Sequence, residues 1–424
     1  MLSKRLSLIA TSLCLINSSI IAMHYYPTFT HPRMFCAEPL LGKDWMTSLM
    51  LDLRGGHANK GFNGCGYSGD ILNIYGNENL FALAKGVPAC ILDRNPSSLI
   101  NDLWGKKPIA NTFGQTTITG SYSLVEFLPT LTQHFKYGFF ATLTIPVKSA
   151  SIKDLSYYDQ TPLHGGGHAI SYVQWQQWFN DLEQQLAYYD VRLGKWRSSG
   201  LGDIQLYGGW ALNYEDTKDL DYVDFTLTAG VNFPTGKKQM PNCVFSLPLG
   251  YNGHWGIPAI ASLSIGAFDW LTVGVQGGVL WLANRRVAVP MKTALEQRGW
   301  IRLARGNAEE KRGLTWHIDE FIKFDHFVEN FSFIFGFSHD HANRSYLYPC
   351  DTTRFDYAIV NTDERLQAWQ SNNFHFVMEF DSATYRHPNL PRIAFTIDKT
   401  FCGKRVFETI LFGAYIGLDI EWFW

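Results

Sequence analysis

The sequence predicts an all-β fold, namely a transmembrane antiparallel β-barrel of about 12 strands with long external loops and short periplasmic turns. Three observations predict it. Apolar and polar residues alternate with period two through most of the chain, which is typical of half-buried strands. The alternating segments run about 10 to 16 residues, whereas soluble strands average about 5 to 6, and a tilted strand crosses a bilayer in about 9 to 11. Long and short connections alternate between the segments, which a soluble double-sheet fold has no reason to produce.

The N-terminus has the layout of a secretory signal peptide. A basic pair at positions 4–5 precedes an apolar run over 6–16, and Ile20 and Ala22 suit positions −3 and −1 of a cleavage site. Cys14 follows a leucine, which is a poor setting for lipid attachment, so we expect cleavage without a lipid anchor. The chain then divides into a signal peptide at 1–22, a periplasmic segment at 23–44 and the barrel at 45–424.

Composition excludes several classes of protein. Of the 424 residues, 15% are aromatic and only 17% are charged, and 37 are glycine. The mean hydropathy of −0.10 is far below that of a helical membrane protein. The net charge is −2, and no basic cluster interleaved with aromatic residues is found, so nucleic-acid binding has no support.

The most apolar stretch after the signal peptide, residues 256–283, lacks the periodicity of a membrane helix. Small and apolar residues alternate on both sides of a polar break at Asp269, which predicts a hairpin. Residues 223–233, 331–338 and 412–424 show the same alternation. The predicted strands are 45–57, 113–128, 135–150, 201–214, 221–235, 255–267, 270–282, 312–324, 330–342, 371–383, 391–401 and 408–424.

The connections between these strands alternate in length, and only the last, at 402–407, breaks the rule. Short turns fall at 129–134, 215–220, 268–269, 325–329 and 384–390. Long loops fall at 58–112, 151–200, 236–254, 283–311 and 343–370.

The strand at 113–128 is irregular, because Glu126 falls on the same face as Ile118, Tyr122 and Leu124. A charged residue on an otherwise apolar face predicts a bulge or an early end to this strand. The strand count therefore lies between 10 and 14.

The chain ends on an amphipathic strand that carries Trp422 and Trp424. Because hydrocarbon cannot satisfy an open sheet edge, this last strand must pair with the first. A terminal aromatic residue on such a strand resembles the signal that bacterial barrel-assembly machinery reads, which predicts that machinery and outer-membrane lipids as partners.

The polar faces of the strands should line the lumen. Acids outnumber bases about two to one there, so we expect cations or neutral solutes to be admitted and anions disfavoured. The alternative is an interior filled by mutually paired charges, with no conduction. The predicted lumen residues are Asp52, Arg54, Lys148, Asp203, Asp224, Asp319, Lys323, Glu379, Asp381, Arg392, Asp398, Asp419 and Glu421.

Two short motifs, Gly-Asp-Ile-Gln-Leu at 202–206 and Gly-Val-Asn-Phe-Pro-Thr-Gly-Lys at 230–237, resemble the outer-membrane porins grouped under the meta-pathway of phenol degradation. The resemblance covers about 40 residues. It implies a channel or transporter for small solutes, aromatic compounds among them, and brings no catalytic residues. The structural alternative is that both motifs only end strands and turn the chain.

Residues 172–189 place aromatic and leucine side chains at helical spacing, which predicts an amphipathic loop helix. Three placements are open for this helix: a constriction of the pore, the outer leaflet of the membrane, or packing over its own loop. The two histidine pairs, at 164 and 168 and at 339 and 341, lack a further ligand, so we expect no metal and no cofactor.

Six cysteines follow the predicted signal peptide, and six cysteines allow 15 pairings. Cys65 and Cys90 share one predicted loop and are the best candidates for a disulfide. Cys243 with Cys350 is a second, weaker pairing, and Cys36 should be unpaired.

Three functions fit this sequence. A channel for passive or selective diffusion of small solutes is the first, and a barrel that displays adhesive loops is the second. A lipid hydrolase is the third, but it needs a serine and a histidine close together on the lipid-facing surface. His339 and Ser338 fall on opposite faces, whereas His317 and His375 should point inward, so we expect no enzyme.

Overall fold

The computed structural model describes residues 45–83, 86, 114–160, 172–215, 220–267, 270–328, 330–382 and 391–421. The predicted signal peptide, the segment at 23–44, Cys36, Cys90, His164, His168, Trp422 and Trp424 lie outside these ranges, so the predictions on them stay predictions.

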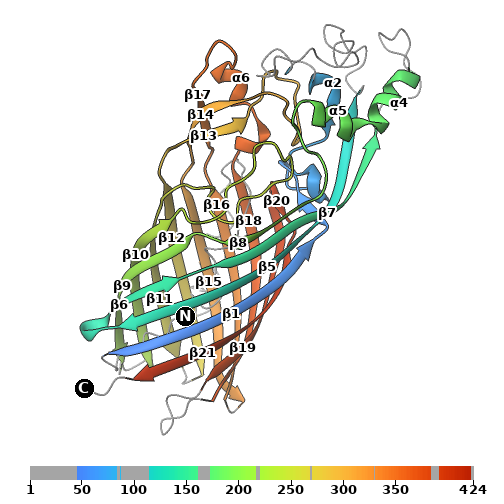
Figure 1. Cartoon of the computed structure of the whole chain (residues 1–424). Helices are drawn as coiled ribbons and strands as arrows, with labels where there is room; N and C mark the ends of the chain where they lie inside the picture. The colour runs from blue at the N-terminus through green and yellow to red at the C-terminus, as the bar shows by residue number, and fades with distance from the viewer. Residues whose placement is uncertain are drawn as a thin grey trace, which may run out of the picture.

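Twelve antiparallel wall strands close into a barrel (Figure 1). Two of them are interrupted near their middle: β6 continues into β7, and β8 continues into β9. The wall strands, in order, are β1 (Met46–Ala58), β5 (Gln115–His134), β6 (Phe139–Thr144) with β7 (Val147–Asp159), β8 (Trp196–Leu201) with β9 (Ile204–Glu215), β10 (Tyr222–Phe233), β11 (Gly256–Ala267), β12 (Leu271–Leu282), β15 (Thr315–Val328), β16 (Phe331–Ala342), β18 (Trp369–Asp381), β19 (Arg392–Lys404) and β21 (Ile410–Glu421).

The barrel closes between the last strand and the first, as the sequence predicts. Strand β1 pairs with β21 from Met46 opposite Glu421 to His57 opposite Ile410. Its other edge pairs with β5. Closure satisfies the backbone donors and acceptors of both terminal strands, which an open edge in lipid would leave unpaired.

All twelve predicted strands are present, but the predicted turn at 129–134 is wrong. Strand β5 continues to His134, and the chain reverses at the 3-10 helix η4 (Lys136–Gly138). The polar residues that suggested a turn are paired across the strands, since the Oγ1 atoms of Thr130 and Thr132 lie 3.2 and 3.0 Å from those of Thr144 and Thr142.

The bulge or early strand end expected near Glu126 is also absent. Strand β5 stays in register there, with Glu126 opposite Lys148, and its register shift lies earlier, between Thr119 and Ser121. Ile118, Tyr122 and Leu124 face inward and are buried, because the long loops cover this end of the barrel interior with apolar side chains.

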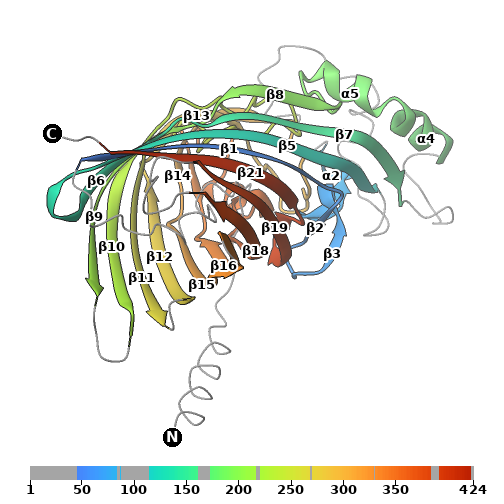
Figure 2. The same ribbon diagram turned by 90° about the horizontal axis from the view of Figure 1, so that it is seen from below.

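The long loops at one end of the barrel fold together into a cap (Figure 1). Strands β5, β7 and β8 extend past the wall toward the helices of the second loop, which is also visible from below (Figure 2). The cap elements are β2 (Lys60–Phe62), β3 (Ser68–Asp70), η2 (Ile71–Asn73), β4 (Glu78–Asn79), α2 (Leu80–Leu83), α4 (Tyr172–Asn180), α5 (Leu182–Tyr188), β13 (Arg285–Pro290), β14 (Arg305–Lys311), β17 (Tyr346–Pro349), α6 (Tyr357–Val360), η5 (Glu364–Leu366) and β20 (Val406–Phe407).

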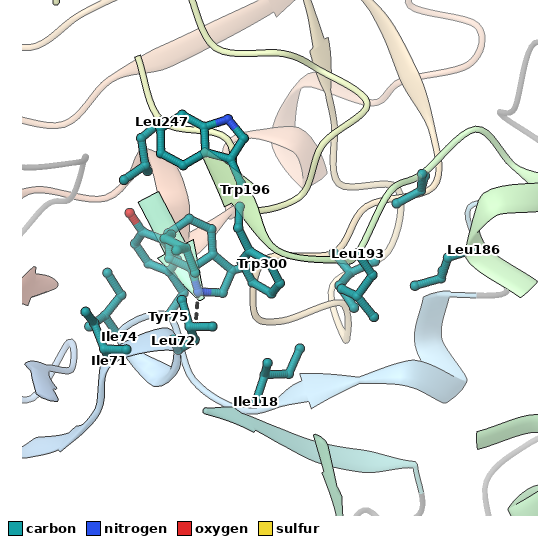
Figure 3. Close-up of a cluster of buried hydrophobic side chains, with 14 of the residues drawn as sticks. Ile71, Leu72, Ile74, Tyr75, Ile118, Leu186, Leu193, Trp196, Leu247 and Trp300 are labelled. Carbon is teal, nitrogen blue, oxygen red and sulfur yellow. Dashed lines mark hydrogen bonds between the residues drawn. The ribbon is translucent and has the colours of Figure 1, made fainter. Parts of the chain in front are cut away.

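The cap has two apolar cores. The larger draws on the loops that follow β1, β7, β10 and β12, and Trp300 lies within it (Figure 3). The indole N–H of Trp300 donates to the carbonyl of Leu72 at 2.7 Å, and its ring lies 4.7 Å from that of Tyr75. The smaller core joins β14 and β17 to α6 and η5 through residues such as Phe355. The loops are therefore an ordered layer with a hydrophobic interior.

The outer face of the wall is apolar. Alternate residues of the wall strands, such as Leu53, Leu227 and Phe395, are 45 to 57% exposed, which is the surface of a barrel that crosses a membrane. No helix in the described ranges is long and apolar enough to span a bilayer.

Candidate functional site: the barrel interior

Ten of the thirteen charged side chains that are predicted to line the lumen are buried in the structure. Among the thirteen, Asp381 and Asp419 are half-buried, and the side chain of Glu421 lies outside the described part. The buried members are Asp52, Arg54, Lys148, Asp203, Asp224, Asp319, Lys323, Glu379, Arg392 and Asp398.

Each predicted lumen base forms an ion pair with an acid inside the barrel. Lys148 lies 2.5 Å from Glu126, Lys323 lies 2.6 Å from Asp325, and Arg392 lies 2.5 Å from Asp419. Arg54 binds two carboxylates, donating from Nε to Asp52 at 3.0 Å and from Nη1 to Asp398 at 2.9 Å. The sequence left open the alternative that charged residues pair with one another inside the barrel. In this part of the interior they do pair.

The Arg54 pair continues into a hydrogen-bond chain across neighbouring strands. His375 donates from Nδ1 to Asp398 at 2.6 Å, and its Nε2 lies 2.9 Å from the Ser338 hydroxyl. Asn373 donates to Ser338 at 3.1 Å and to Asp340 at 2.8 Å. The chain links β1, β19, β18 and β16, so it braces these strands from inside.

The hydrogen bonds link a serine, a histidine and an aspartate in the sequence found in a hydrolase triad: Ser338, His375 and Asp398. Sequence reasoning missed this arrangement. As predicted, His317 and His375 point inward. The Ser338 side chain is 0% exposed and accepts a second hydrogen bond from Asn373, while the second oxygen of Asp398 is bound to Arg54. A substrate cannot reach a serine so enclosed, and we assign the three residues to the brace.

An apolar layer lies inside the barrel below this brace. It consists of inward side chains from six strands that pack into one buried cluster. Its members are Met50, Phe321, Ile334, Val377, Ala394 and Tyr415. Sequence reasoning missed the layer because strand alternation predicts a polar inward face throughout, although Phe321 alternates in step with Asp319 and Lys323.

The opposite side of the interior carries small side chains. Eight inward residues of β5, β6, β10 and β11 are half-buried threonines and serines, although other inward residues of these strands, such as Asp224 and Ile260, are buried. We call this surface the hydroxyl wall: Thr130, Thr132, Thr142, Thr144, Thr226, Thr228, Ser262 and Ser264.

Asp203, one of the predicted lumen residues, clamps a loop to the wall. Its Oδ1 accepts from the backbone N–H of Gly236 at 2.8 Å, and its Oδ2 accepts from that of Tyr251 at 2.5 Å. Thr235 completes the clamp, accepting from Ile204 N–H at 3.0 Å and donating to the Gly202 carbonyl at 2.8 Å. The two motifs that carry the family resemblance therefore bind each other.

The clamp predicts a local loss of stability. Asp203→Ala removes the acceptor of two backbone N–H groups, each of which costs about 1–3 kcal/mol when left unsatisfied. Trypsin should therefore cut after Lys237 or Lys238 several-fold faster than in the wild type, as followed by mass spectrometry of the folded barrel. Asp224→Ala, which removes an inward aspartate of the next strand, is the control. Equal cleavage of the two variants would contradict the clamp.

A buried carboxylate joins the first and fourth long loops. Glu78 is 2% exposed and accepts from the backbone N–H groups of Trp300 and, at 3.3 Å, Ile301. Burial raises the pKa of Glu78 to about 7, and these N–H groups only partly oppose it. Burial in the closed cap thus disfavours the ionised form of Glu78 relative to the same group in water.

This burial predicts that the cap loosens as the pH rises. Because the pKa of Glu78 is higher in the cap than its ordinary value of 4.5, stability is greatest below pH 4.5 and falls until about pH 7, by about 3 kcal/mol. The loss of cap stability can be measured by hydrogen exchange at the backbone amides of Trp300 and Ile301. The wild type and Glu78→Gln are compared at each pH. Between pH 5 and 8 the protection should fall in the wild type and stay level in the variant. A parallel fall in both would exclude Glu78 as the cause.

A second buried carboxylate leaves that pH window undisturbed. Burial opposes ionisation of Glu310, but Arg312 and His254 outweigh it and lower the pKa of Glu310 to about 2. Its contribution is complete above pH 4.5 and is lost only as the pH falls toward 2.

The predicted loop helix is present as α4 and α5, and it packs over its own loop. Trp175, Trp178, Leu182 and Leu186 are buried in the larger cap core. The remaining two placements, constriction and outer leaflet, are thereby excluded for these side chains.

The predicted disulfide between Cys243 and Cys350 is wrong, because both are free. Cys243 packs against the larger cap core, whereas Cys350 is exposed beyond β17. Cys65 is free as well. His339 and His341 share the outer face of β16 beside Trp316, and no cluster of three metal-ligating residues occurs in the ranges that the structure describes.

No protein family model and no curated protein matches the chain. Among solved structures, an outer membrane channel from Pseudomonas putida F1 is 9% identical, covers 89% of this chain and 96% of its own, and has a TM-score of 0.47. The Pseudomonas putida toluene transporter TodX is 10% identical, with 95 and 96% covered and a TM-score of 0.30. The CymD monoaromatic hydrocarbon channel is 9% identical, with 92 and 93% covered and a TM-score of 0.30. At these values no solute and no residue role passes to this chain.

Proposed function

We propose that the chain is an outer-membrane channel that passes small solutes to the periplasm. The observation that carries the proposal is the hydroxyl wall: inside a closed barrel, small polar side chains on β5, β6, β10 and β11 stay half-buried. A solid core would bury them under large apolar residues. Hydroxyl groups offer both donors and acceptors to a passing solute without the cost of desolvating a fixed charge.

The solutes are small, uncharged and in part apolar. The four lumen bases predicted from the sequence are neutralised by acids within 3.0 Å. In this proposal the path runs between the hydroxyl wall and the apolar layer that contains Phe321 and Tyr415, and an ion would lose hydration there. This narrows the expectation from the sequence, which admitted cations as well. The likeness of residues 202–206 and 230–237 to porins of phenol degradation supports aromatic compounds among the solutes.

Swelling of vesicles that contain the purified barrel tests the proposal. Arabinose should enter faster than arabinonate, its anion of about the same size. Thr226→Trp, which fills the lumen beside the hydroxyl wall, should abolish entry, whereas Ala229→Trp, which faces outward on the same strand, should not. A folded wild-type barrel that admits neither solute, or two tryptophan variants that behave alike, would refute the channel.

The cap favours surface display as the second candidate function. Its loops form two apolar cores, the larger of them together with inward residues of the wall, which is more structure than a pore entrance requires. Deleting residues 172–188, the α4–α5 segment, should leave arabinose entry intact if this segment serves display. Loss of adhesion of whole cells in the same variant would favour that function.

The location of the protein rests on the same fold. An apolar outer wall and a closed sheet suit the outer membrane, with the cap outside and the short turns in the periplasm. Export through cleavage near Ala22, and insertion by barrel-assembly machinery that reads Trp422 and Trp424, complete the proposal.

A further inference from the structure

The outward row of β15 contains a carboxylate among membrane-facing residues. In sequence order this row is Trp316, Ile318, Glu320, Ile322 and Phe324, because alternate residues of a strand share a face. Ile318 and Ile322 are 43 and 42% exposed. Glu320 therefore stands halfway between the aromatic residues that bound this row, at the depth of the hydrocarbon.

The neighbouring strands leave Glu320 in apolar surroundings. Its register partners are Val275 on β12 and Phe337 on β16. Glu320 makes no hydrogen bond and no ion pair with any residue in the described ranges. By contrast Lys399, which faces outward on β19 nearer the cap, is paired with Glu408 at 2.8 Å.

A lone carboxylate facing lipid is costly. Ionisable groups on the lipid face of a barrel destabilise it most at the midplane, and in membranes they are found paired or at functional sites. Glu320 thus calls for a partner that the single chain does not supply.

A base lies on the same face but out of contact. His339 of β16 pairs in register with Ile318, so it is diagonal to Glu320, at about 7–8 Å between strand positions. Its Nδ1 lies 2.6 Å from the Asn372 side chain, and its ring is tilted by 44° to that of Trp316, with 5.3 Å between the ring centroids. No hydrogen bond joins Nε2 to the described residues.

Phenylalanines surround this acid and base. Phe335 lies 6.4 Å from Phe374 and 5.2 Å from Phe376, measured between ring centroids, and Phe335 and Phe374 are each 42% exposed. Elsewhere the outer wall is richer in aliphatic residues, as on β12. We call the outward surface of β15, β16 and β18 the Phe face.

We propose that the Phe face binds the same face of a second copy of this chain in the membrane. A two-fold axis between the two positions brings Glu320 against His339 of the partner subunit, and His339 against the partner's Glu320. A patch that carries one acid and one base side by side is complementary to itself, as an isologous interface requires. Each pair satisfies a carboxylate where lipid offers it no donor.

The proposal goes beyond the channel, since it depends on the outer surface and not on the lumen. Glu320 and His339 make no contact within the chain, whereas a symmetric partner supplies a base to Glu320 and an acid to His339 at the same time. The aromatic rings on both sides of the two pairs add the packing that helix-free membrane interfaces need.

Photo-crosslinking in native membranes tests the interface. A photo-reactive phenylalanine analogue in place of Phe335 should give a band at twice the chain mass. The same analogue in place of Phe127, which is 38% exposed on β5 far around the wall, is the matched control and should give none. A product of any other mass at Phe335, or equal products at both sites, would overturn the proposal.

Variants of Glu320 and His339 then distinguish association through the acid–base pairs from nonspecific hydrophobic association. Glu320→Leu and His339→Leu should each lower the crosslinked fraction by about tenfold, since a tenfold change in association corresponds to about 1.4 kcal/mol. The exchange variant Glu320→His with His339→Glu should restore it, because the symmetric pairs re-form with their roles reversed. Heat-modifiability on gels verifies that each barrel is folded. Unchanged crosslinking in both leucine variants, or no recovery in the exchange, sinks the idea.

Discussion

Replacing Arg54 with methionine is expected to destabilise the barrel by about 3–5 kcal/mol, because it leaves two buried acids without the cation they bind. Arg54 is 4% exposed and joins Asp52 on its own strand to Asp398 on β19. The brace continues from Asp398 through His375 to β18 and β16, so the loss should spread across four strands. Denaturant unfolding of the barrel in lipid vesicles, followed by tryptophan fluorescence, measures the change.

The control for this prediction is an ion pair in water. Arg305 lies 2.8 Å from Asp190 in the cap, where the aspartate side chain is 54% exposed. Arg305→Met should cost no more than about 1 kcal/mol, since exposed pairs contribute little. If both variants lost the same stability, burial of the Arg54 pair would not be the reason.

Replacing Phe321 with alanine is expected to raise ion conductance by about tenfold, because it opens the apolar layer that ions must cross. Hydrophobic constrictions exclude water as well as ions, and one tenfold change in rate corresponds to about 1.4 kcal/mol of barrier. Phe321 is 5% exposed and belongs to the cluster that spans six strands. Single-channel recording in planar bilayers gives the measurement.

Phe395→Ala is the matched control, since this phenylalanine lies on the outer face of β19 and is 57% exposed. Its removal should leave conductance unchanged. A Phe321→Ala barrel that conducts like the wild type would show that the apolar layer is not on the path.

The wall strands were predictable from the sequence because the two faces of each strand meet different surroundings. Lipid outside and polar groups inside enforce alternation at every strand, so twelve strands and their closure followed from pattern alone. The turn at 129–134 was misplaced because threonine suits both a turn and an inward strand position, and only pairing partners such as Thr144 distinguish them.

The sequence predicts which residues point into the barrel, but it does not predict which of them pair with one another. Register on one strand places Arg54 and Asp398 inside, yet which acid meets which base depends on the stagger between strands that are distant in sequence. The clamp of Asp203 on Gly236 was invisible for the same reason. Glu320 was detectable, since it interrupts the apolar row from Trp316 to Phe324, and the inward Phe321 was detectable by the same count.

The larger cap core combines residues from segments that lie far apart in the sequence. Ile71 comes from the first long loop, Trp300 from the fourth, and Leu411 from the last strand. No subset of these segments that is synthesised early contains the whole core. The larger core is therefore incomplete until the last wall strand packs with the loops. The packing of the cap and the closure of the wall thus depend on the same strand, β21.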